Sequence, residues 1–169
     1  ASLVLALVVP LGVGAISFAL SFAMGKAPFE YKGGSHSNSF TILFLLSLFT
    51  LLVGGMSQMR EFIKESDIYR RERLVNLKIL PYVASKLWLA LVMAIWQGFA
   101  YTVMQYLAFK MPGGSAEFGQ IFVTLSLAAF SGMMLGLLSS AVSPNAASSP
   151  LILIMMIIPL IVLSGYVAP

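Results

Sequence analysis

Long apolar runs alternate with short polar stretches along the whole chain. The apolar runs cover about residues 1–25, 40–59, 82–109, 118–142 and 150–167. Each is close to the roughly 20 residues that a helix needs to cross the hydrocarbon core of a bilayer. The pattern predicts an all-α fold, a polytopic transmembrane helical bundle with about five spans that form a single domain over residues 1–169.

Charge is concentrated in one polar stretch, residues 60–86. It holds seven of the ten basic and four of the six acidic residues. Apolar positions recur there at roughly helical spacing, which predicts an amphipathic connecting helix from Arg60 to about Leu77. Pro81 lacks a backbone N–H and disfavours a helical Leu80, so we expect a break there and a new helix that begins near Pro81.

The distribution of basic residues predicts the orientation. Residues 60–86 have a net charge of +3, against +1 for residues 26–38 and zero for residues 110–117. Cytoplasmic loops carry the excess of Lys and Arg, so the charged stretch is expected in the cytoplasm and Pro169 outside. The chain begins at Ala1 and ends just after an apolar run, which predicts a piece of a longer protein with at least one further span.

Composition supports a membrane protein and excludes several kinds of site. Only 9% of the residues are charged and 59% are hydrophobic, whereas soluble domains carry about a quarter charged residues. There is no cysteine, and the one histidine, His36, lies in a polar loop without partners at ligand spacing, so no metal site is expected. The net charge of +4 follows from membrane topology and does not favour nucleic-acid binding.

No catalytic motif accompanies these spans. Neither a P-loop, nor H-E-x-x-H, nor G-x-S-x-G occurs, so an intramembrane enzyme is not supported and no cofactor is expected in this chain. Every Asp, Glu, Lys and Arg lies in a predicted loop or at a helix end. Ion-driven transporters need ionisable groups at depth, so energy for active transport would have to enter from outside the membrane, through the charged stretch.

Small and polar residues inside the spans suggest contacts between helices. Gly132, Gly136 and Ser140 recur every four residues and predict a flat strip for close packing against a neighbouring backbone. The hydroxyl of Thr50 is expected to bond its own backbone. Gln97 and Gln105 either join helices or face a polar cavity.

Several motifs resemble the permease domain of ABC transporters of the ABCG or White type. They are ESDIYRRER at residues 65–73, YVASK at 82–86, GLLSS at 136–140, NAASS at 145–149 and PLIVLSG at 159–165. The order and spacing agree over essentially the whole chain, and the arginine-rich loop is more similar to bacterial members, which implies the bacterial inner membrane.

The resemblance implies a six-span exporter half, here without the last span, that works as a dimer. An ATP-hydrolysing nucleotide-binding domain, fused or separate, would hold ATP and Mg and contact the charged loop. The residues implied in coupling to it are Glu65, Tyr69, Arg71, Glu72 and Arg73. The implied cavity for a hydrophobic or amphipathic substrate involves Thr50, Val53, Ile154, Ile157 and Ile158. Tyr166 and Val167 would form the plug, although the family often has a leucine pair there.

Two other interpretations of the charged stretch stay open. The amphipathic helix could simply lie on the lipid headgroups. Alternatively, the chain could be a non-transporting membrane anchor or scaffold that docks a cytoplasmic partner. A Walker A motif upstream or in an adjacent gene would favour the transporter.

Overall fold

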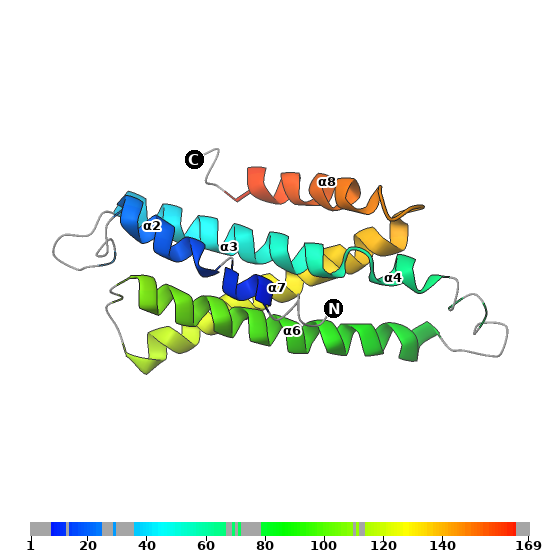
Figure 1. Cartoon of the computed structure of the whole chain (residues 1–169), viewed down its shortest axis with the longest axis horizontal. Helices are drawn as coiled ribbons and strands as arrows, with labels where there is room; N and C mark the ends of the chain where they lie inside the picture. The colour runs from blue at the N-terminus through cyan, green and yellow to red at the C-terminus, as the bar shows by residue number, and fades with distance from the viewer. Residues whose placement is uncertain are drawn as a thin grey trace.

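We describe a computed structural model of the chain, covering residues 8–12, 14–24, 29, 36–66, 69, 71, 79–109, 111 and 114–164. These residues form a helical bundle, and no strand occurs among them, as the apolar pattern predicts (Figure 1). The helices are α2 (Ile16–Met24), α3 (His36–Gln58), α4 (Glu61–Lys64), α6 (Ile79–Ala108), α7 (Ser115–Val142) and α8 (Ser149–Val162).

Three of the helical stretches in the described part are long and apolar enough to cross a membrane. They are Ser37–Lys64, Ile79–Ala108 and Ser115–Val142, with 28, 30 and 28 residues. Two shorter apolar helices, Val8–Ala23 and Ser149–Val162, lie where the sequence predicts the first and last spans. Helix α6 begins at Ile79, two residues before Pro81, so the predicted break at Leu80 is wrong: Leu80 is helical. Pro81 is tolerated there because an N–H in the first turn has no intrahelical partner to lose.

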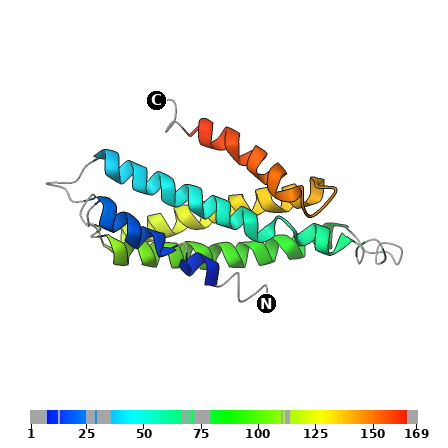
Figure 2. The ribbon, with the colours of Figure 1, turned by 45° about the horizontal axis from the view of Figure 1, so that its top comes forward.

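Helix α7 is the centre of the bundle. It contacts α3, α6, α8 and α4, while α2 lies against α6 and α3. The largest buried apolar cluster joins α6 to α7 through alanines and long side chains, namely Ala90, Ala94, Ala129, Met133 and Leu137. Helix α8 leaves the bundle at an angle, so that its C-terminal end lies away from α7 (Figure 2).

Glycines bring the backbones of α3 and α7 into direct contact. A Cβ on Gly132 would collide with the carbonyl oxygen of Leu51, and one on Gly136 would collide with that of Gly55. The contact is equally close on the α3 side, because a Cβ added to Gly54 would lie 2.6 Å from the carbonyl oxygen of Ala129. The predicted small-residue strip on α7 is therefore confirmed as a packing surface.

A glutamine joins α6 to α3 in the bundle interior. The amide Nε2 of Gln97 donates to the carbonyl oxygen of Thr50 at 2.9 Å, and both side chains are buried. The hydroxyl of Thr50 donates to the carbonyl oxygen of Leu46 at 2.7 Å, as the sequence predicts. Gln97 thus acts as an interhelical contact, the first of the two roles considered for it. Gln105 is also fully buried, but its amide has no partner among the described residues.

Candidate functional site

The charged side chains of the long loop gather at one end of the bundle, around a break between α3 and α4. We call residues 59–66 the elbow. Helix α3 ends at Gln58, Met59 and Arg60 form a turn, and the short α4 ends in a second turn at Glu65. The N-terminus of α6, the C-terminus of α7 and the N-terminus of α8 lie at the same end of the molecule (Figure 1).

Two serines of other helices satisfy the backbone groups that the break leaves unpaired. The hydroxyl oxygen of Ser140, on α7, accepts hydrogen bonds from the backbone N–H groups of Phe62 and Ile63, at 3.0 and 3.3 Å. The hydroxyl of Ser149, at the start of α8, donates to the carbonyl oxygen of Met59. The first N–H groups of a helix need such partners, and Arg60 supplies none from its side chain.

An ionic cluster ties the elbow to the start of α6. Lys86 pairs with the carboxylate of Glu65 and lies 3.7 Å from that of Glu61. Tyr82 donates its hydroxyl to Glu65 at 2.9 Å. The hydrogen bond from Lys86 lowers the pKa of Glu65 below its usual value, against the opposing effect of burial, and the bond from Tyr82 adds to the lowering.

Aromatic rings cover this cluster. The ring of Tyr82 lies 5.9 Å from that of Phe62 and 5.0 Å from that of Tyr69, measured between centroids. Glu61 and Lys64, three residues apart on α4, form an ion pair at 3.5 Å, as helical spacing favours. The elbow is thus joined to α6, α7 and α8 by side-chain contacts.

The residues predicted to couple to an ATPase differ in their exposure to solvent. Glu65 and Tyr69 are half-buried against Tyr82, whereas Arg71 is exposed. Glu72 and Arg73 lie outside the described residues, as do Tyr166 and Val167 of the predicted plug. Among the described residues, the exposed cationic side chains at this end are those of Arg60, Lys64 and Arg71.

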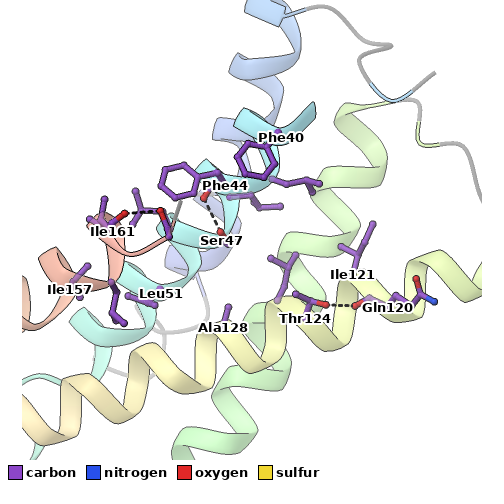
Figure 3. A pocket seen from close by; sticks show the side chains of 16 residues that line it. Phe40, Phe44, Ser47, Leu51, Gln120, Ile121, Thr124, Ala128, Ile157 and Ile161 are labelled. Carbon is purple, nitrogen blue, oxygen red and sulfur yellow. Dashed lines mark hydrogen bonds between the residues drawn. The ribbon is translucent and has the colours of Figure 1, made fainter. Parts of the chain in front are cut away.

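A groove of about 680 Å³ lies between α3, α7 and α8 (Figure 3). Most of its lining is apolar, with Phe40, Phe44 and Leu51 from α3 facing Ile121 and Ala128 from α7. Its hydroxyl groups bond backbone carbonyls three or four residues earlier in the chain: Ser47 that of Phe44, Thr124 that of Gln120, and Ser164 that of Ile161. The groove therefore suits an apolar or amphipathic occupant better than a strongly polar one.

One of the five predicted cavity residues, Ile157, lines this groove. Thr50 is fully buried between helices and Val53 is half-buried, while Ile154 and Ile158 are 45% and 51% exposed on α8. Within one chain, these five side chains therefore do not line a common pocket. Their role in a cavity shared by two copies stays a prediction.

Sequence reasoning missed the contacts that Ser149 and Ser140 make with the elbow. Ser140 belongs to the packing strip and Ser149 to a short polar connection, and neither position predicts a partner 78 or 90 residues away along the chain. Among the described residues, no group of three or more histidine or acidic side chains could hold a metal ion.

Comparison with known proteins agrees with this architecture. The ABC-2 type transporter family matches residues 2–169. The chain is 27% identical over 161 residues to the "ABC transporter ATP-binding/permease protein Rv1747" of Mycobacterium tuberculosis (strain ATCC 25618 / H37Rv), a match that covers 92% of this chain and 18% of that protein. No solved structure matches.

The family match extends over essentially the whole chain, and three helices of the described part have the length and apolar character of membrane spans. The chain therefore belongs to the ABC-2 type transporter family, as an integral membrane permease domain.

Proposed function

We propose that this domain is the membrane part of an ATP-driven exporter that moves a hydrophobic or amphipathic substrate. The observation that carries the proposal is the elbow, where exposed cationic residues adjoin a cluster anchored to three other helices. A force applied to the elbow would reach α6, α7 and α8 through contacts already in place. Apolar spans without ionisable groups at depth favour an external source of energy.

The proposed partner at the elbow is an ABC nucleotide-binding domain, fused or separate, which holds ATP and Mg. Arg71 is the described coupling residue most accessible to it, and Glu72 and Arg73 are proposed to share the contact. Glu65 and Tyr69 would not contact the partner directly but would hold the elbow against Tyr82 of α6. The charged loop would face the cytoplasm of a bacterial cell, across the inner membrane.

A second permease half, in a homodimer, is proposed to complete the substrate cavity. The exposed side chains of Ile154 and Ile158 are available for such a surface, and Ile157 lines the groove beside it. Tyr166 and Val167 are proposed to close the cavity towards the outside. The preference for an apolar substrate rests on the lining of the groove.

The test uses the complete transporter in inside-out proteoliposomes, with a fluorescent short-chain phospholipid and a rhodamine dye as probes. We expect Arg71→Ala and Glu72→Ala to retain ATP binding but to lose ATP-dependent accumulation of the probe. The reason is that the movement of the nucleotide-binding domain would no longer be transmitted to the elbow. Glu117→Gln, which removes an exposed charge in the first turn of α7 at the other end of the bundle, is the control and should transport normally. Unchanged transport in both elbow variants would contradict the proposal.

The other candidate function is a scaffold that docks a cytoplasmic partner without transport. The anchored elbow with its exposed cations would also suit such a role. The same experiment separates the two, since a scaffold accumulates neither probe when ATP is added to the unsubstituted protein.

A further inference from the structure

Helix α8 is joined to the elbow through the side chain of its first residue. The hydroxyl of Ser149 donates to the carbonyl oxygen of Met59 and lies 3.4 Å from the hydroxyl of Ser139 on α7. Ser149 is fully buried, so water does not compete for these contacts. Met59 is the first residue after α3 and begins the elbow, so the bond acts at the break itself.

The elbow is held on the other side of the break by α7. Ser140, 2% exposed, accepts from two successive backbone N–H groups of α4. These bonds leave α4 seated on the end of α7 next to Ser149. A displacement of α4 therefore acts at the first turn of α8.

The rest of α8 is attached less firmly. Leu153 and Ile157 are its buried apolar side chains, whereas Met155 is 72% exposed and the last residues, Val162 and Leu163, are 52% and 81% exposed. Figure 2 shows the helix diverging from α3 beyond its first turns. No side chain in the last turn of α8 is buried, so the helix can turn about its N-terminal end, and a small shift there becomes a larger shift at its far end.

The groove lies in the angle that α8 makes with the bundle. Ile157, Leu160 and Ile161 of α8 form one wall, and residues of α3 and α7 form the others (Figure 3). A rotation of α8 about Ser149 would therefore change the width of the groove.

We propose that Ser149 is a positioning residue, whose hydroxyl makes α8 follow the elbow and so links the state of the ATPase to the width of the groove. This inference rests on the proposed function. It predicts that α4 and the first half of α8 keep a constant separation when nucleotide binds, while α8 moves relative to the middle of α6.

The test measures distances between spin labels in the full-length transporter, with and without trapping by ATP and vanadate. Labels are placed on cysteines that replace exposed side chains, at Lys64 on α4, Val92 on α6 and Met155 on α8. This stretch has no cysteine of its own. In the unsubstituted background, we expect the distance from Met155 to Val92 to change on trapping and the distance from Lys64 to Met155 to stay constant.

Substitution of Ser149 then separates positioning from simple packing. In Ser149→Ala, the change between Met155 and Val92 should fall at least about two-fold while vanadate trapping persists, since the hydrogen bond that transmits it is lost. Ser149→Thr keeps a hydroxyl and should restore the change. Ser131→Ala removes an exposed hydroxyl of α7 that bonds only its own helix, and should behave like the unsubstituted protein.

Each result decides something. An undiminished change in Ser149→Ala overturns the inference, and so does a separation between Lys64 and Met155 that varies as much as that between Met155 and Val92. The latter measurement needs no substitution at Ser149, so it remains decisive if that variant fails to fold. If no label pair responds to nucleotide in the unsubstituted transporter, the proposed function and this inference fall together.

Discussion

At the scale of single residues, glycine and serine make the closest contacts between helices. Gly132 and Gly136 allow the backbones of α3 and α7 to touch, and Ser140 and Ser149 pair backbone groups of another segment. Neither residue type adds apolar area. Because lipid is as apolar as the helices themselves, burying apolar area does not drive helices together in a membrane. Glycine and serine stabilise the bundle by allowing close approach of backbones and by pairing polar groups.

Adding a methyl group to Gly136 should destabilise the bundle. The new Cβ would collide with backbone atoms of Gly55, which cannot move aside as a flexible side chain can. We expect Gly136→Ala to cost about 1–3 kcal/mol of folding free energy. The measurement is the thermal unfolding temperature of the purified transporter in detergent.

The matched control is Gly119→Ala on the same helix, where a Cβ would meet nothing within 4 Å. It should leave the unfolding temperature unchanged or slightly raised, since alanine favours helix. Equal losses in the two variants would show that close approach is not the reason for glycine at Gly136.

The ion pair of Glu65 and Lys86 should make stability depend on acid pH. The pKa of Glu65 is lowered in the folded protein from 4.5, chiefly by its bond to Lys86. A lowered carboxyl pKa contributes stability that is fully present above the unfolded value and is lost as pH falls through the folded one. The contribution is below about 1 kcal/mol, because the side chain of Glu65 is 35% exposed.

Unfolding temperatures of the unsubstituted protein and Glu65→Gln, measured from about pH 6 to about pH 3, test this. The difference between them should hold above pH 4.5 and shrink below it. In a Lys86→Met background the pH dependence of that difference should largely vanish. A difference that grows on acidification would contradict the assigned cause.

At the scale of elements, α8 depends on a few apolar contacts. Leu153 is 1% exposed, and its methyl groups lie close to Gly55 of α3. Its neighbours Ile154 and Met155 are largely exposed on the other faces of the helix. The attachment of α8 is therefore concentrated on one side of the helix, at Leu153 and Ile157.

Truncation of Leu153 should loosen this attachment. We expect Leu153→Ala to cost about 2 kcal/mol through the cavity it leaves, and to speed hydrogen exchange in residues 149–162 specifically. Met155→Ala, truncated at a position 72% exposed, is the control and should leave both properties unchanged. Faster exchange throughout the bundle, instead of in α8 alone, would argue against a separately attached helix.

At the scale of the whole molecule, charge marks the two ends differently. Arg60, Lys64 and Lys86 lie at the end that holds the elbow, and Glu117 lies at the other end, where its carboxylate accepts from the backbone N–H of Gly114. Because basic residues are retained on the cytoplasmic side, the elbow end should face the cytoplasm.

Labelling with a membrane-impermeant maleimide tests the orientation. Lys64→Cys should react in inside-out vesicles and be protected in intact cells, and Glu117→Cys should show the opposite pattern. Both side chains are at helix ends and exposed, so access to the reagent is comparable. Reaction of both positions from one side would contradict the predicted topology.

The helical fold and the gathering of charge could be predicted from local pattern, but much of the candidate site could not. The pairing of Glu61 with Lys64 was predictable because helical spacing alone brings them together. The contact of Ser149 with Met59 was not, since nothing in a short polar turn indicates its partner. Gln97 was expected either to join helices or to face a cavity, but its partner, the carbonyl oxygen of Thr50, could not be predicted.

What the sequence by itself determined was the set of apolar helices, their separation by polar loops and the charged end, because hydropathy over about 20 residues is a local property. The tertiary structure decided which face of each helix meets which neighbour. In these helices apolar residues lie on every face, so periodicity does not distinguish the side that packs from the side that meets lipid. The packing faces are marked by the close approach of backbones at Gly136 and by the hydrogen bonds of Ser140 and Ser149. The bond of Ser149 also holds α8 beside the elbow.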